Sequence, residues 1–400
     1  MNRKILHIDV NNAFLSWTAV EKLNNGETID IRTIPAIIGG DEAQRKGVVL
    51  AKSNLAKQFG IKTGEPIYFA RKKCPQIQIF ETNFKVYKKY SDAMFKILSD
   101  YTNIIERFSI DECFIDLTHF MPHDADLVKK AYEISNRIKQ ELGFTVNVGV
   151  STNKILAKMA SDFQKPDRVH TLFPEEIQQK MWKLPVGELF MVGRRSTPKL
   201  ERLGIRTIGD LAKYDHKIIS SNLGKFGDMI WNYANGIDDS QVMFLPEKPK
   251  GIGNSATFPY DITDLEKLNE ALLVITDQVA YRLRKSEMLA KVINVQIKNN
   301  KFEVTSHQKK LDMPTNSTRK IYEEAKQLLK SLYSGTPIRL LGLRVDNLCE
   351  KDEMQISLFD VNKDSKQEKI DKTIDTIKEK YGCNLITRAG KMNVNNIIKL

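Results

Sequence analysis

The sequence predicts a multidomain protein of the α+β class. One observation is its length, because 400 residues exceed what a single hydrophobic core usually serves. A second is the order strand, helix, strand, strand, helix, strand within residues 4–150. A third is the recurrence of that order over residues 253–350, after a helix-rich segment at residues 170–235. The pattern favours two α+β domains joined by a helical one.

The first domain opens with an apolar run, KILHID at residues 4–9, whose final acid is typical of a central strand that ends at the sheet edge. A helix is expected from Phe14 and another over residues 82–101. The second helix has one apolar face at three- and four-residue spacing, made by Tyr87, Tyr90, Met94, Leu98 and Tyr101.

Two strands, NIIERFSI and CFIDL, follow, and the helical spacing returns over residues 124–142 at Leu127, Ala131, Ile134, Ile138 and Leu142. Gly143 ends this helix before the alternating strand FTVNVGV. This order is the split βαβ, or ferredoxin-like, arrangement, in which the first and third strands lie side by side. Asp9 is therefore expected close to the SIDE segment, residues 109–112.

The stretch FSIDECFID, residues 108–116, places Asp111 and Glu112 side by side between apolar flanks. Successive side chains of a strand point to opposite faces, so the two acids can share a site only where the chain turns or bulges. We therefore predict a hairpin junction, with Asp9 delivered from the neighbouring strand. Three converging carboxylates require cations, and two Mg²⁺ ions would also support in-line displacement at phosphorus, or nucleotidyl transfer. The alternative is two acids on a surface hairpin.

The charge of the chain favours a polyanionic partner. Lys and Arg number 62 against 50 Asp and Glu, a formal net charge of +12, which indicates nucleic acid ahead of an acidic membrane surface. No window has the apolar length of a membrane span, and no secretory signal is expected. The four cysteines lack CxxC spacing and are expected to be reduced thiols of a cytoplasmic protein.

Three motifs in this order and spacing resemble those of the Y-family translesion DNA polymerases, in particular the bacterial polymerase IV (DinB-like) branch. HIDVNNAFLS resembles the first metal motif, FSIDECFID the second, and NVGVSTNKILAKMASDFQKP a palm segment with a lysine near its end. The resemblance implies a ferredoxin-like palm with inserted fingers, a helical thumb and a second βαββαβ domain, the little finger. The implied bounds are palm 1–20 and 78–168, fingers 21–77, thumb 169–240, linker 241–252, little finger 253–350 and tail 351–400.

In the palm, the resemblance makes Asp9 and Asp111 metal ligands and Glu112 the catalytic carboxylate, which also contacts the metals. Val10 would lend its backbone carbonyl to the same two Mg²⁺ ions.

For the nucleotide, Phe14 corresponds to a steric gate that leaves no room for a 2′-hydroxyl, beside Ala13; the alternative is a core residue of the first helical turn. Lys165 would pair with the incoming triphosphate. Where many relatives carry a tyrosine and an arginine, this chain has Asn54 and Lys57, which keep a donor and a charge but not a bidentate grip on phosphate.

The motif GGDE at residues 39–42 is the core of the diguanylate cyclase signature, which also uses a ferredoxin-like palm and two metals. Here it lies outside the palm hairpin and precedes Ala43 instead of an aromatic residue. A Gly-Gly turn between two finger strands explains it more simply.

The segment LFMVGRRSTPKLERLGIRTIGDLA resembles a thumb helix-hairpin-helix, in which Gly193, Arg194 and Arg195 would hold a DNA phosphate. Met191 stands where the first glycine of such a hairpin is common. The alternative is a plain helical subdomain. The little finger has no paired acids at its hairpin, KNNKF, and is expected to contact DNA phosphates without catalysis; its alternative is a purely structural domain.

QISLF at residues 355–359 resembles the bacterial sliding-clamp pentapeptide, with Gln355 hydrogen-bonded and Leu358 and Phe359 as apolar anchors. The alternative is a frayed strand end. Beyond it, Ile370, Ile374, Ile377 and Tyr381 fall on one face of an expected helix.

The implied function is synthesis of DNA on a primer–template from dNTPs with two Mg²⁺ ions, by a monomer. The domains leave no residues for a proofreading exonuclease, so low fidelity and lesion tolerance are expected, with clamp tethering offsetting weak processivity. Two alternatives are a non-catalytic DNA- and clamp-binding accessory factor and a nucleotidyl cyclase. Template dependence distinguishes the polymerase from both.

Overall fold

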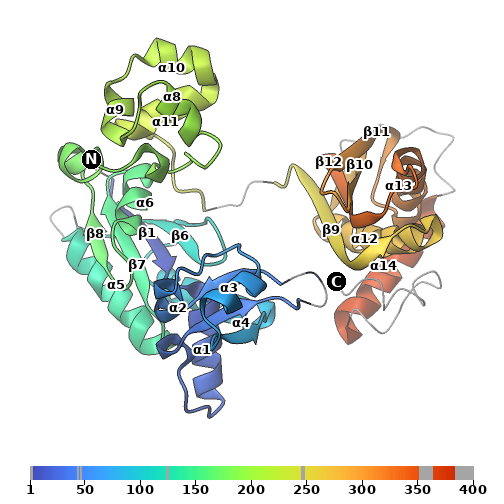
Figure 1. Ribbon diagram of the computed structural model, residues 1–400, viewed down its shortest axis with the longest axis horizontal. Coiled ribbons are helices and arrows are strands. Elements are labelled where there is room, and N and C mark those ends of the chain that lie inside the picture. Colours follow the sequence, from blue (N-terminus) through green and yellow to red (C-terminus); the bar gives the residue numbers. More distant parts are fainter. Residues whose placement is uncertain are drawn as a thin grey trace. The chain divides into compact units, whose positions relative to one another are not determined.

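The computed structural model describes residues 3–42, 45, 47–122, 126–244, 248–350 and 364–382. The chain divides into two compact units, Met1–Gly40 with Val48–Pro246, and Asp41–Gly47 with Glu247–Leu400 (Figure 1). Each unit has hydrophobic cores of its own. No helix of the described residues has the length and apolar composition needed to cross a bilayer.

The first unit contains the predicted ferredoxin-like sheet. Its strands pair in the order β5-β6-β1-β7-β8. Their bounds are β1 Ile5–Val10, β5 Ile105–Arg107, β6 Glu112–Asp116, β7 Val146–Ser151 and β8 Val169–Thr171. The first and third strands of the predicted order, β1 and β6, are antiparallel neighbours, which confirms that expectation. Strand β8 pairs in parallel with β7 and extends the sheet beyond the predicted strands.

Helices cover the core face of this sheet. They are α1 (Ala13–Asn24), α4 (Phe84–Ser99) and α5 (Leu127–Leu142). The predicted apolar faces are confirmed, except that Tyr101 lies beyond the end of α4 and Leu142 is half-buried. Gly143 ends α5 with a φ of 74°, a left-handed conformation that glycine adopts without steric cost.

The opposite face of the sheet carries α6 (Lys154–Asp162). Leu6 and Ile8 of β1 belong to the core on the first face, so the alternating residues His7 and Asp9 point toward α6. A close approach of helix and strand occurs at Gly149 of β7. A Cβ atom there would lie 1.9 Å from the carbonyl oxygen of Ala157 in α6. On the face of the sheet that carries His7 and Asp9, the backbone of α6 therefore packs directly against the backbone of β7.

The finger segment forms a smaller sheet in the order β3-β2-β4. Its elements are η1 (Ile31–Thr33), β2 (Ala36–Gly39), β3 (Val49–Lys52), α2 (Asn54–Gln58), α3 (Ile67–Lys73) and β4 (Gln78–Glu81). Strand β4 runs parallel to β2, so this sheet extends to residue 81, whereas the fingers were expected to end at residue 77. The GGDE motif begins at the end of β2, in the connection between two finger strands.

The following segment is helical around its own core. Its elements are η2 (Pro174–Glu176), α7 (Ile177–Lys180), η3 (Val186–Glu188), α8 (Thr197–Arg202), α9 (Ile208–Lys213), α10 (His216–Leu223) and α11 (Lys225–Ala234). Met191 has a φ of 72°, so a non-glycine residue holds the left-handed conformation at the position where the related motif has glycine.

The second unit repeats the order of elements but not the order of strands. Its elements are β9 (Gly251–Ile262), α12 (Leu265–Lys285), β10 (Met288–Asn299), β11 (Val304–Thr315), α13 (Thr318–Leu332) and β12 (Ile338–Glu350). The sheet order is β11-β10-β12-β9, so its inner strands are the second and fourth of the repeat. Strand β9 begins at residue 251, inside the segment assigned to the linker.

A last helix, α14 (Asp364–Tyr381), confirms the helix expected in the tail. Some of its charged residues pack inward: the Lys378 ammonium lies 2.6 Å from Asp277 Oδ2, and both side chains are buried. Ile370 and Tyr381 of the expected apolar face are exposed. The motif QISLF lies outside the described residues.

Candidate active site

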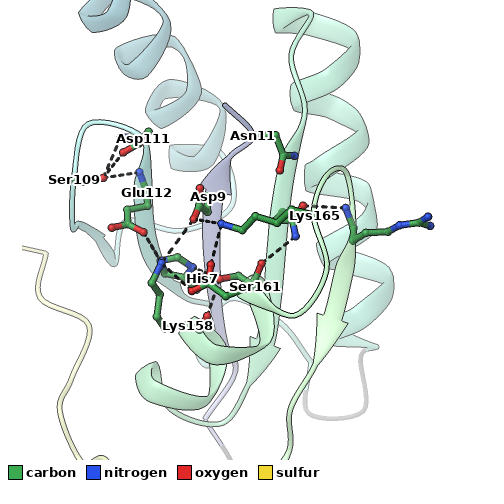
Figure 2. Close-up of polar contacts among 12 residues, drawn as sticks. His7, Asp9, Asn11, Ser109, Asp111, Glu112, Lys158, Ser161 and Lys165 are labelled. Carbon is green, nitrogen blue, oxygen red and sulfur yellow. Dashed lines mark hydrogen bonds and ion pairs between the residues drawn. The ribbon is translucent and has the colours of Figure 1, made fainter. Parts of the chain in front are cut away.

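The sheet order brings two of the predicted carboxylates together. Asp9 of β1 and Glu112 of β6 are direct partners in the antiparallel register. Asp111 stands just before β6, and its carbonyl oxygen accepts the N–H of Val10 at 2.9 Å. Figure 2 shows Asp9 and Glu112 on neighbouring strands, with Asp111 in the adjoining turn. The predicted proximity of Asp9 to the acidic pair is therefore present.

Ser109 organises the turn that precedes β6. Its Oγ donates to Asp111 Oδ1 at 2.5 Å and accepts the backbone N–H groups of Asp111 and Glu112 at 3.2 and 3.1 Å. The N–H groups of Phe108 and Ser109 both donate to the carbonyl oxygen of Glu112. The chain thus turns between the two acids and the preceding strand, as their adjacency requires.

Two lysines compensate these carboxylates. Lys158 Nζ, from α6, lies 2.7 Å from Glu112 Oε2 and 3.7 Å from Asp9 Oδ2. Lys165 Nζ lies 2.7 Å from the same Asp9 oxygen. Burial acts to lower the pKa of each ammonium, but the neighbouring carboxylates outweigh it and raise the pKa of both lysines. Both side chains are therefore charged at neutral pH.

The two adjacent acids have opposite electrostatic environments. Burial acts to raise the pKa of Glu112, but hydrogen bonding to His7 and Lys158 outweighs it and lowers that pKa to about 2. Burial raises the pKa of Asp111, and the charges of Asp9 and Glu112 raise it further against the hydrogen bond from Ser109. Divergent pKa values on neighbouring acids are typical of functional sites.

A buried polar layer lies under Glu112. His7 is fully buried, with Nε2 3.4 Å from Glu112 Oε2 and Nδ1 2.8 Å from Ser161 Oγ of α6. Burial is the main cause that lowers the pKa of His7, so the imidazole is neutral at pH 7. Glu112 therefore rests between a neutral ring and a charged lysine (Figure 2).

The donor set suits a hard divalent cation. Carboxylate and carbonyl oxygens are the ligands that Mg²⁺ prefers, and Asp9, Asp111 and Glu112 present three carboxylates where β1 meets β6. Within the described ranges, no group of three or more His, Cys, Asp and Glu side chains is arranged to hold a metal ion. In this structure the lysine ammonium groups lie against Asp9 and Glu112 instead.

Phe14 is half-buried at the start of α1. Its ring stacks on Tyr87 with centroids 4.6 Å apart and an interplanar angle of 15°. Trp17 and Phe84 each lie 6.1 Å away, centroid to centroid. Phe14 thus packs on the core and also keeps a partly exposed surface, while the neighbouring Ala13 is buried.

Asn54 and Lys57 lie on α2, exposed. Asn54 Oδ1 accepts from Asn12 Nδ2 at 3.4 Å, which links the fingers to the loop after Asp9. Burial and then the charge of Lys57 lower the pKa of Lys52, so two cations lie close together here. Lys52 is a candidate anion contact that the sequence analysis missed.

Lys158 and His7 were also missed. His7 lies in the motif HIDVNNAFLS and Lys158 in NVGVSTNKILAKMASDFQKP, at positions to which the family resemblance assigns no role. The sequence does contain one indication of Lys158. It lies among the apolar residues of a helix, where a buried lysine requires an acidic partner, and Ser161 follows three residues later on the same helix. Gly193, Arg194 and Arg195 are exposed in the loop before α8, away from this cluster in sequence.

The fold and the site together indicate the class of protein to which this chain belongs. The structure resembles a solved chimeric Y-family DNA polymerase over 87% of this chain and 99% of that one, with a TM-score of 0.77 at 23% identity. The fold is therefore that of a Y-family DNA polymerase, with palm, fingers, thumb and little finger.

Family models match most of the chain. Residues 8–162 match the impB/mucB/samB family, residues 249–358 its C-terminal domain, and residues 188–238 the thumb domain of DNA polymerase-iota. A curated relative named DNA polymerase IV, from Clostridium acetobutylicum, is 49% identical over 97% of this chain and 98% of its own length. Another of that name, from Acetivibrio thermocellus, is 38% identical over 96% of each chain. The chain belongs to the impB/mucB/samB family of Y-family polymerases, in its DNA polymerase IV branch.

Proposed function

We propose that this protein is a DNA-directed DNA polymerase of the translesion type, which adds dNTPs to a primer 3′ end. The observation that carries the proposal is the register of β1 and β6, which sets Asp9 opposite Glu112 with Asp111 in the adjoining turn. The second domain and the thumb supply the DNA-binding surface expected of such an enzyme. The accessory-factor and cyclase alternatives are not favoured by the DNA polymerase IV relatives.

Asp9, Asp111 and Glu112, with the Val10 carbonyl, would hold two Mg²⁺ ions. Bound there, the ions would lower the pKa of the primer hydroxyl and stabilise charge on the reacting phosphate. Lys165 is within reach of Asp9 and 38% exposed, so it can turn toward a triphosphate. Lys52 and Lys57 supply further positive charge from the fingers, and Asn54 a hydrogen-bond donor.

Phe14 would exclude a ribonucleotide, beside the buried Ala13. Its ring stacks on Tyr87, which limits movement of the ring away from a 2′-hydroxyl. We expect Phe14→Ala to raise the use of rNTPs relative to dNTPs by at least about tenfold. Competition between the two nucleotide classes in primer extension measures this ratio.

The remaining contacts concern DNA and the clamp. Gly193, Arg194 and Arg195 are proposed to hold a DNA phosphate, and Gln355, Leu358 and Phe359 to bind the sliding clamp. Low fidelity, action as a monomer and a cytoplasmic location belong to the same proposal. Replacing the three clamp residues with alanine should abolish clamp-stimulated extension while extension without the clamp persists.

Primer extension on a templated duplex tests the central proposal. The full chain should extend the primer with Mg²⁺ and dNTPs, and Asp111→Ala and Glu112→Ala should each lose that activity while still binding the duplex. A full chain that binds the duplex and adds no nucleotide would instead support the accessory factor.

A further inference from the structure

Lys158 contacts three carboxylates at once. Its Nζ lies 2.7 Å from Glu112 Oε2, 3.7 Å from Asp9 Oδ2 and 3.5 Å from Asp162 Oδ2. Its side chain is only 10% exposed. A lysine so enclosed keeps one position, because an alternative rotamer would take the cation away from the largely buried carboxylate of Glu112.

The helix that carries Lys158 cannot shift easily. Gly149 allows the backbone of α6 to lie directly against β7, and a Cβ atom there would meet Ala157 O at 1.9 Å and Ser161 N at 2.6 Å. Ser161, one turn from Lys158, bonds to His7 of β1 at 2.8 Å. The ammonium is thus held at a set place relative to β1 and β6.

Lys165 differs in each of these respects. It lies beyond the end of α6, is 38% exposed, and contacts Asp9 and Asp162 but no atom of Glu112 among the described ion pairs. One lysine is therefore rigid beneath the site, and the other can leave it.

We propose that Lys158 is a positioning residue: a built-in cation that holds Glu112 in register with Asp9 and competes with divalent ions for their charge. This inference rests on the proposed polymerase function. Lys158 touches no reacting atom and acts through Glu112. The fixed charge of Lys158 weakens the binding of divalent cations at this site. The same contact holds the Glu112 carboxylate in one orientation before metal ions bind.

The test compares Lys158→Met with Lys154→Met. Lys154 is a matched control, since it lies one turn earlier on α6 and pairs with Glu106 at 2.7 Å, with side chains 15% and 17% exposed. Mn²⁺ binding to the full chain without DNA is measured by calorimetry, and kcat and KM for a dNTP by primer extension.

We expect Lys158→Met to bind Mn²⁺ at least about threefold more tightly, because a competing charge is removed, and to lose at least about tenfold in kcat with KM changed by less than about threefold. Lys154→Met should keep the native Mn²⁺ affinity. Lys158→Arg, which retains the charge, should keep it as well. If Lys158→Met fails to fold, Lys158→Gln carries the same expectation.

Unchanged or weaker Mn²⁺ binding by a folded, uncharged variant would overturn the inference and make Lys158 a structural residue. Tighter binding with unchanged kcat would overturn the positioning role. A native chain that neither extends a primer nor loses Mn²⁺ binding on Asp111→Asn would instead remove the proposed function itself.

Discussion

The palm and the little finger share one order of elements and differ in how their strands pair. In the palm, the first and third strands, β1 and β6, are neighbours at the centre of the sheet. In the little finger, the first and third strands, β9 and β11, lie at opposite edges, with β12 and β10 between them. Both domains share the element order βαββαβ, yet only the palm has the split βαβ pairing that brings those two strand ends together.

This difference explains why one domain has a carboxylate site. Asp9 is the second-last residue of the first strand and Glu112 begins the third, so only adjacency of those strands makes them partners. The corresponding ends in the little finger could not meet even if they carried acids. The two domains share the same order of elements along the chain. The pairing of their strands determines which domain can form the carboxylate site.

The two central hairpins show the same contrast. In the palm, Ser109 receives the N–H groups of two acids and so presents both carboxylates. In the little finger, Asn299 Oδ1 accepts the N–H groups of Lys301 and Glu303 at 3.0 Å each. That turn is closed in the same way but presents no pair of acids.

The largest expected effect separates the two hairpins. Glu112→Gln should lower kcat of primer extension by about 10³-fold or more, because an amide removes the charge required at the reacting centre. Glu303→Gln, in the little-finger turn, is the control and should stay within about twofold of the native chain. A Glu112→Gln enzyme within tenfold of native would mean that the register of β1 and β6 is incidental.

The next comparison uses the last strand of each repeat. Gly149→Ala in β7 should destabilise the first unit by about 3 kcal/mol, because a Cβ would collide with the backbone of α6. In β12, a Cβ at Gly342 would lie 3.2 Å from Ser255 Cβ, and Gly342→Ala should cost less than about 1 kcal/mol.

Urea unfolding measures both glycine variants. Tryptophan fluorescence follows the first unit, which contains all three tryptophans, Trp17, Trp182 and Trp231. Circular dichroism follows both units. A Gly149→Ala loss below about 1 kcal/mol would show that the close approach at Gly149 relaxes at little cost.

Charge networks offer a third comparison. Lys378→Met removes the cation from the buried carboxylate of Asp277 and should weaken docking of α14 by about 3 kcal/mol. Lys285→Met is the control, since its pair with Glu379 spans 3.9 Å at an exposed site, and it should cost less than about 1 kcal/mol. Hydrogen exchange in α14 reports both. Primer extension without a clamp should persist in both variants, whereas loss of it would give this network a catalytic role.

The smallest expected effect is the pH dependence of the palm acids. Because the pKa of Glu112 is lowered from 4.5 to about 2, its contribution to stability, about 2 kcal/mol after allowance for partial exposure, is complete above pH 4.5 and lost as pH falls toward 2. Asp111 has a raised pKa and opposes folding at neutral pH. In EDTA at pH 7, Glu112→Gln should therefore lower the unfolding free energy and Asp111→Asn should raise it. If both substitutions changed the free energy of unfolding in the same direction, the two acids would not have opposite electrostatic environments.

Much of the fold follows from local patterns. Helical spacing located α4 and α5, and the apolar runs located the palm strands β1, β5, β6 and β7 within a few residues. The adjacency of Asp111 and Glu112 correctly required a turn. These features depend on residues near one another along the chain, so periodicity and turn chemistry suffice to predict them.

Other features were not visible in the sequence. Helix α14 forms where a helix was expected, but charged side chains pack inward from it, because Arg284 pairs with Asp375 and Lys378 pairs with Asp277. The polar layer of His7, Ser161 and Lys158 joins residues more than 150 positions apart on two elements. The spacing of residues within one helix or strand does not show which distant residue will contact it.

The sequence by itself determined the elements, their order, the family motifs and the three acids of the palm. Only the tertiary structure decided that the little-finger strands pair in another order, that Asp9 is the direct partner of Glu112, and that Lys158 lies beneath both. The physical reason is that periodicity and turn preferences are local, whereas strand order and the compensation of a buried charge depend on which distant surfaces come into contact.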